Sequence, residues 1–143
     1  MKKTLSLLLA AAMTLSLAAC GGTETPETTP STTPSTEPVS YTEMGEGATT
    51  FYFAVQDLDG TVTNFKIKTD AKTVGEALVA LKLIQGDQGD YGLMVHTVNG
   101  IKADWATEQA YWAFYINGEY AMTGVDSTDV VADATYSFVK TKG

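Results

Sequence analysis

The chain has 143 residues, with 9 Lys+Arg against 17 Asp+Glu, a formal net charge of −8 and a hydrophobic content of 44%. This length leaves room for one ordinary domain and excludes a long multidomain enzyme. The charge has the wrong sign for neutralising phosphates, so nucleic acid is not an expected partner. One cysteine excludes an internal disulfide framework and a Cys-rich metal site, and one histidine leaves little for a zinc site.

Residues 1–19 have the pattern of a secretory signal peptide. Lys2 and Lys3 give a positive start, and an apolar run over residues 5–17 ends in the small residues Ala18 and Ala19. A helix needs about 20 apolar residues to cross a bilayer, so this run is too short to serve as a membrane span. We therefore expect the segment to be removed from the mature chain.

The only cysteine follows this segment directly. The sequence Leu17-Ala18-Ala19-Cys20 resembles the lipobox of bacterial lipoproteins. The resemblance implies cleavage before Cys20, acylation of its thiol and attachment to the extracytoplasmic face of a bacterial cell membrane. Two or more acyl chains give stable anchoring, whereas a single chain binds only marginally. The alternative is an ordinary secretory signal with a buried cysteine.

Residues 20–47 are rich in Thr, Pro, Glu, Ser and Gly and contain all four prolines of the chain. Such a composition buries too little apolar surface to offset the entropy lost on ordering, which predicts a disordered linker. Repeated Thr-Pro and Glu-Pro steps favour an extended spacer. A glycosylated stalk and a Pro-rich ligand are the alternatives.

Residues 48–143 are expected to fold as one domain, beginning with a hairpin and a helix. Apolar residues alternate over 49–57 and again over 61–69, and Asp59-Gly60 between them is a typical hairpin turn. Thr73 and Glu76 have the spacing of a capping box, and apolar residues then recur at helical spacing up to Ile84. We expect this helix to stop at Gly86 and to pack on one face of a sheet.

The rest of the domain reads as further strands. Residues 86–92 predict a polar loop, 93–98 a strand, and 101–110 are ambiguous. Two strands, 111–116 and 119–123, flank the turn Asn117-Gly118, and a final strand covers 135–140. This order predicts an α+β fold, a mostly antiparallel sheet with one helix packed on one face.

The second hairpin sorts its side chains between two faces. A two-residue loop pairs Phe114 with Ala121 and Ala113 with Met122, which places Trp112, Phe114 and Ile116 together as candidate core. The opposite face carries the candidate ligand-binding residues, with Tyr52 as a potential neighbour: Tyr111, Tyr115, Tyr120 and Met122. Flat amphipathic rings suit stacking on a planar ligand or gripping a protein. The alternative is that these residues only stabilise the sheet across its strands.

The order of elements is that of a β-grasp, and several motifs carry a more specific resemblance. They are Thr73-Val74-Gly75-Glu76-Ala77-Leu78, Thr97-Val98-Asn99-Gly100-Ile101, Tyr111-Trp112-Ala113-Phe114, Asn117-Gly118 and Gly124-Val125-Asp126. With these motifs, the domain resembles the C-terminal domain of transcobalamin and intrinsic factor, and more closely a related bacterial family of surface and lipoprotein domains of unknown function. The resemblance implies a β-grasp module that takes part in enclosing a cobalamin. The carriers have a large helical domain on the other side of the ligand, and this chain has none.

No motif predicts catalysis or a metal site. His96 is interpreted as a packing residue rather than a metal ligand, and Asp57, Asp59, Asp126 and Asp129 as turn caps rather than calcium ligands. We expect a monomeric lipoprotein that is not an enzyme, has no resident cofactor, and binds a small planar ligand such as a corrinoid. The alternatives are a protein-interaction or adhesion module and an enzyme using converging carboxylates.

Overall fold

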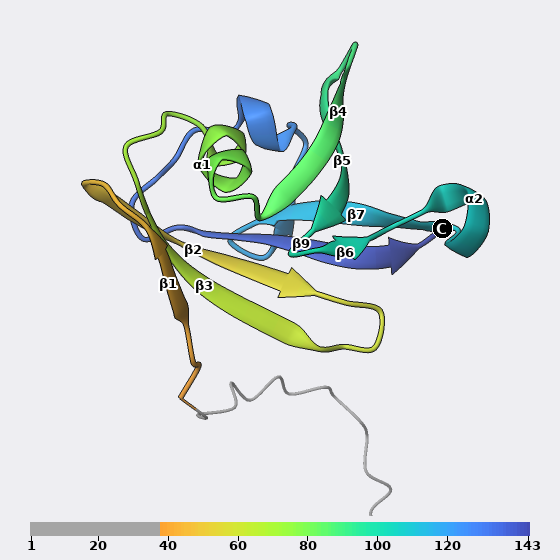
Figure 1. The fold of residues 1–143 in the computed structure, drawn as a ribbon, viewed down its shortest axis with the longest axis horizontal. Coiled ribbons are helices and arrows are strands. Elements are labelled where there is room, and N and C mark those ends of the chain that lie inside the picture. The colour runs from red at the N-terminus through yellow and green to blue at the C-terminus, as the bar shows by residue number, and fades with distance from the viewer. Residues whose placement is uncertain (1–37) are drawn as a thin grey trace, which may run out of the picture. The chain divides into compact units, whose positions relative to one another are not determined.

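The computed structural model describes residues 38–143, a mixed α+β fold made mainly of strands (Figure 1). The predicted signal peptide, Cys20 and most of the predicted linker lie outside these residues. The elements in chain order are β1 Thr42–Gly45, β2 Thr49–Gln56, β3 Val62–Thr69, α1 Val74–Ala80, β4 Ile84–Gly89, β5 Gly92–Val98, β6 Ile101–Lys102, α2 Trp105–Glu108, β7 Ala110–Ile116, β8 Glu119–Tyr120, the 3₁₀ turn η1 Val125–Ser127, and β9 Thr135–Lys142.

The strands form two sheets. A six-stranded sheet has the order β1-β3-β2-β9-β7-β8, and a three-stranded sheet has the order β4-β5-β6. The β1/β3 and β2/β9 ladders are parallel, while the other ladders are antiparallel. Helix α1, the β4–β5 hairpin and η1 lie on the same side of the six-stranded sheet (Figure 1).

The first hairpin is confirmed in the position of its strands and its turn. Strands β2 and β3 pair antiparallel with Phe53 opposite Phe65. The turn between them places Gly60 at φ +85°, and the Asp59 carboxylate accepts the backbone N–H of Thr61 at 2.8 Å. Glycine takes this backbone conformation at no steric cost, which explains why the Asp-Gly pair predicted the turn.

Strand β1 lies within the stretch that composition assigns to the linker. It pairs with β3, and its Glu43 carboxylate accepts from Lys66 Nζ at 2.9 Å and lies 3.5 Å from Lys68 Nζ. The hydrogen bond from Lys66, followed by the charges of both lysines, lowers the pKa of Glu43. Met44 packs against the core. These partners lie more than twenty residues away, so local composition misplaced the linker boundary at residue 47.

Helix α1 begins as predicted and ends earlier. Both halves of the capping box form, with Glu76 N–H donating to Thr73 Oγ1 at 3.2 Å and Thr73 N–H donating to Glu76 Oε2 at 3.4 Å. The helix ends at Ala80, and Lys82 at φ +58° turns the chain into β4. The predicted helical stretch to Ile84 is therefore wrong at its end, because Ile84 is drawn into the core as a strand residue.

The predicted polar loop over residues 86–92 is also corrected. These residues extend β4 and turn into β5, forming a hairpin that projects from the domain (Figure 1). Gly86 is no helix stop. It lies at a register shift in β4, where a side chain would collide with the Met94 carbonyl. A backbone contact of this kind explains the glycine there.

The second hairpin is confirmed at its turn and shortened beyond it. Asn117 and Gly118 both have positive φ, and Tyr115 pairs with Tyr120 and Ile116 with Glu119. Ala121 N–H still donates to Phe114 O at 2.9 Å, but β8 ends at Tyr120. The predicted pairing of Ala113 with Met122 is not made, because the chain leaves the sheet to bury Val125 in η1.

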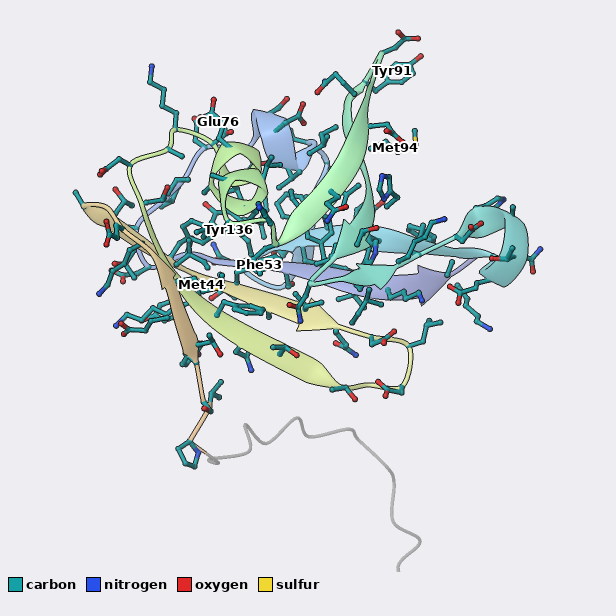
Figure 2. The ribbon with its side chains drawn as sticks, viewed as in Figure 1. Met44, Phe53, Glu76, Tyr91, Met94 and Tyr136 are labelled. Atoms are coloured by element: carbon teal, nitrogen blue, oxygen red, sulfur yellow. The ribbon has the colours of Figure 1, made fainter. Side chains whose placement is uncertain are left out.

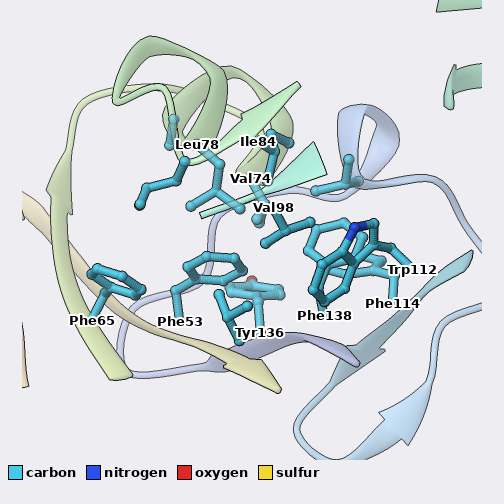
Figure 3. Close-up of a cluster of buried hydrophobic side chains, with 14 of the residues drawn as sticks. Phe53, Phe65, Val74, Leu78, Ile84, Val98, Trp112, Phe114, Tyr136 and Phe138 are labelled. Carbon is cyan, nitrogen blue, oxygen red and sulfur yellow. The ribbon is translucent and has the colours of Figure 1, made fainter. Parts of the chain in front are cut away.

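The core lies between the six-stranded sheet and the elements on one side of it, α1, the β4–β5 hairpin and η1 (Figure 3). Phe53, Tyr136 and Phe138 come from adjacent central strands, and α1 adds Val74 and Leu78 to the same cluster. Trp112 and Phe114 are buried, as predicted from their register. No helix within residues 38–143 has the length and apolar character needed to cross a membrane.

Candidate functional site

A cleft of about 490 Å³ lies between the three-stranded sheet and the start of β7. Strands β4, β5 and β6 supply one side, and α2 with the adjoining end of β7 supplies the other. The lining residues are Asp87, Met94, Val95, His96, Lys102, Ala103, Asp104, Trp105, Ala110 and Tyr111. We call this hollow the cleft.

Two aromatic residues form one wall of the cleft. Trp105 and Tyr111 are 60% and 40% exposed, and their ring centroids lie 6.4 Å apart at an interplanar angle of 56°. Met94 on β5 adds a thioether and is 72% exposed (Figure 2). Exposed rings and a thioether are groups that bind flat or apolar ligands well.

Helix α2 holds Trp105 in this position. The Asp104 carboxylate accepts the N–H groups of Ala106 and Thr107 at 2.9 and 3.3 Å, and Gln109 ends the helix at φ +51°. The segment that sequence reasoning left ambiguous is thus a single capped turn. Asp104, a residue type favoured at helix N-caps, was the available signal, but a four-residue helix is too short to show a helical periodicity.

The helix cap should respond to acid. The hydrogen bond from Lys102, followed by the two backbone N–H groups, lowers the pKa of Asp104 from its usual 3.8. Because the folded pKa is lowered, the cap stabilises α2 above pH 3.8 and is lost only as the pH falls through the lowered folded pKa. We expect the indole NMR signal of Trp105 to shift with a midpoint below 3.8. Asp104→Asn should abolish that transition, and a midpoint at or above 3.8 in the unaltered chain would refute the cap.

Polar groups lie along the opposite side. His96 Nε2 is 3.8 Å from Asp87 Oδ2, and His96 Nδ1 lies 2.9 Å from Thr97 Oγ1. The side chain of His96 is 39% exposed and that of Asp87 is 91% exposed. Lys102 Nζ lies 3.2 Å from Asp104 Oδ2. His96, interpreted from sequence as a packing residue, therefore borders the cleft, because strand alternation turns it toward Asp87 of β4 rather than into the core.

A second hollow of about 270 Å³ separates β5 from β7 and shares Met94, Val95 and Tyr111 with the cleft. Trp112 also lines it, and its buried indole Nε1 has no hydrogen-bond partner among residues 38–143. The Asp126 carboxylate of η1 closes the nearby turn of the hairpin, accepting Leu93 N–H at 3.1 Å. A side chain at Gly92 would approach Asp126 Oδ1 to 2.8 Å, so the carboxylate fits only against glycine.

Asp126 should therefore hold the β4–β5 hairpin in place. Replacing it with alanine leaves the partly buried Leu93 N–H without its acceptor, which should cost about 1–3 kcal/mol of unfolding free energy. Denaturant unfolding and amide exchange at Leu93 measure this effect. Asp129→Ala is the matched control, because its side chain is exposed. Unchanged exchange protection at Leu93 in Asp126→Ala would contradict the assignment.

The predicted site residues do not gather in one place. Tyr115 and Tyr120 pack together with ring centroids 5.6 Å apart, and they line neither hollow. Met122 is 92% exposed beyond the end of β8, and only Tyr111 reaches the cleft. Tyr52 instead packs against Tyr41 at 5.2 Å. Trp105, Met94 and Asp87 were missed, because the long-range packing of the hairpin against β7 creates the cleft.

The comparisons with known proteins concern this same part of the chain. A family model described as a domain of unknown function, DUF4430, matches residues 71–135. The chain is also similar to a protein from Ruminococcus gnavus whose crystal structure is described as that of a "putative metal binding protein". The two sequences are 31% identical, and the match covers 67% of this chain and 99% of the other, with a TM-score of 0.64. The chain belongs to the family of that protein. The residues matched by the DUF4430 model, 71–135, include every residue that lines the cleft.

A more distant likeness is to haptocorrin in complex with Cbi. It has 16% identity and a TM-score of 0.49 over 66% of this chain and 25% of that one, which is too weak to bear on function. Comparison with curated proteins gives no match.

Proposed function

We propose that the chain is a binding module whose cleft takes a small planar ligand, with a corrinoid as the leading class, and that it catalyses no reaction. The observation that carries this proposal is the exposed pair Trp105 and Tyr111, set beside Met94 in a cleft of about 490 Å³. Pockets with aromatic walls and few polar groups are typical of ligand sites. Lys102 and Asp104 are engaged with one another, which favours binding over proton transfer.

The proposal includes a β-grasp arrangement, with α1 on one face of the six-stranded sheet. Val74, Ala77 and Leu78 of α1 join the cluster that contains Phe53 and Tyr136, which supports this arrangement. Such a layout leaves the β4–β5 hairpin free to form one side of the cleft.

The description of the Ruminococcus gnavus relative raises a metal as a second ligand type. A protein site for a metal ion commonly uses three or four side chains. Within residues 38–143 no three His, Cys, Asp or Glu side chains converge, and His96 with Asp87 is a pair. The described residues therefore do not supply such a set of metal ligands, and our proposal concerns an organic ligand.

We further propose that the ligand is bound outside the cell membrane by a monomeric, anchored protein. The signal-like residues 1–19 and the lipobox-like sequence before Cys20 support this location, and the Pro-rich stretch that follows suits a spacer.

Tyr111→Ala should weaken cobalamin binding about tenfold, because one of two stacking rings is lost. Calorimetric titration of the full-length chain in a non-ionic detergent measures the dissociation constant. Tyr120→Ala removes the same side chain from the neighbouring strand, outside the cleft, and should leave affinity unchanged. Absence of binding in the unaltered chain, or equal losses in both variants, would overturn the proposal.

A protein-interaction or adhesion module is the second candidate function. The observation that favours it is the exposure of two large side chains at and after β8, outside the cleft lining. Tyr120 is 58% exposed and Met122 is 92% exposed. Loss of a surface partner in a chain carrying Tyr115→Ala with Tyr120→Ala, while cobalamin remains inert, would favour this function.

A further inference from the structure

The two rings of the aromatic wall, those of Trp105 and Tyr111, face the cleft at different angles. Trp105 and Tyr111 are tilted by 56° at a centroid distance of 6.4 Å, so they form a corner rather than a stack. The faces of tryptophan and tyrosine carry negative partial charge and attract cations, tryptophan most strongly. A corner of two such rings can contact a bulky cation on two of its sides.

The charges around this corner are mostly negative. Residues 84–111 carry Asp87, Asp90, Asp104 and Glu108 against the single Lys102. Lys102 is bound to Asp104, and Lys140 Nζ lies 2.9 Å from Glu108 Oε2. Within the described part of the chain, Asp87 and Asp90 have no lysine partner, and only Asp87 lines the cleft. Asp87, whose Oδ2 lies 3.8 Å from His96 Nε2, therefore contributes a carboxylate without a lysine partner to the lining of the cleft.

From this arrangement we propose that the ligand of the cleft carries an organic cation of the quaternary ammonium class, enclosed by Trp105, Tyr111 and the Met94 thioether and attracted by Asp87. The alkyl groups of such a cation contact the rings and the thioether, while its diffuse charge needs no set of coordinating oxygens. This inference rests on the proposed function only in placing the ligand in the same cleft.

Choline and its uncharged analogue 3,3-dimethylbutan-1-ol, which have nearly the same shape, test the charge directly. The full-length chain in a non-ionic detergent is titrated with each compound, and binding is followed by the indole NMR signal of Trp105. We expect choline to bind about tenfold more tightly than the alcohol, the combined effect of two rings and one carboxylate.

Two variants with the same charge change separate a specific contact from general attraction. Asp87→Asn should weaken choline binding severalfold and leave the alcohol unaffected, whereas Asp90→Asn, on the same hairpin but outside the cleft lining, should change neither. Equal affinity for the two compounds, no binding of choline in the millimolar range, or equal losses in both variants would overturn the inference. If cobalamin still bound with Tyr111 dependence in that case, the proposed function would stand without it.

Discussion

Replacing Phe53 with alanine is expected to lower the free energy of unfolding by about 3–5 kcal/mol. Phe53 is completely buried in β2, between β3 and β9. Its ring lies 5.9 Å from that of Phe65 and 6.2 Å from that of Phe138, centroid to centroid. Alanine removes these contacts and leaves a cavity at the junction of three strands, where the backbone is held by ladders on both sides and cannot collapse into it.

Urea unfolding of the unaltered and altered chains measures this loss. Tyr52→Ala serves as the control, because Tyr52 is the preceding residue on the opposite, partly exposed face of the same strand. Phe53→Leu should cost less than about 1.5 kcal/mol, since it keeps most of the volume. If Phe53→Ala lowered the free energy of unfolding no more than Tyr52→Ala, the placement of Phe53 in the core would be contradicted.

Replacing Cys20 with serine is expected to release the chain from the membrane. Serine lacks the thiol that the lipobox-like sequence predicts as the acylated group. Two or more acyl chains contribute about 0.8 kcal/mol per buried CH₂, so their loss removes nearly all of the membrane affinity of an otherwise acidic chain. Fractionation of bacterial cells and metabolic labelling with palmitate measure the outcome.

A relocated thiol provides the control for this experiment. A chain with Cys20→Ser and Ser40→Cys keeps one cysteine but moves it away from residues 17–19, and it should remain unlabelled and soluble. Palmitate label on the relocated cysteine, or membrane retention of the Cys20→Ser chain, would contradict the lipoprotein assignment.

Local patterns predicted the parts of the fold that local interactions decide. The Asp59-Gly60 and Asn117-Gly118 turns need positive φ, and Thr73 with Glu76 closes a capping box within four residues, so each leaves a signal in the sequence. The alternation of side chains along a strand likewise predicted that Trp112 and Phe114 lie on the opposite face from Tyr111, because successive strand residues point to opposite faces.

Parts that depend on distant partners were mispredicted. Strand β1 pairs with β3 and packs Met44 against the core, and Asp126 of η1 holds the β4–β5 hairpin. Neither contact is visible in a window of neighbouring residues. The same limit applies to the candidate cleft, because Trp105, Met94 and Asp87 come together only once the hairpin packs beside β7. Sequence reasoning therefore favoured the tyrosines of the second hairpin and found one cleft residue, Tyr111.

The most direct test of the account is amide NMR shift mapping of the full-length chain as cobalamin is added. Binding in the cleft predicts that the largest shifts lie at Met94, His96, Trp105 and Tyr111, which come from three elements, β5, α2 and β7. Shifts concentrated at Tyr115, Tyr120 and Met122, or no shifts at all, would contradict the cleft as the ligand site.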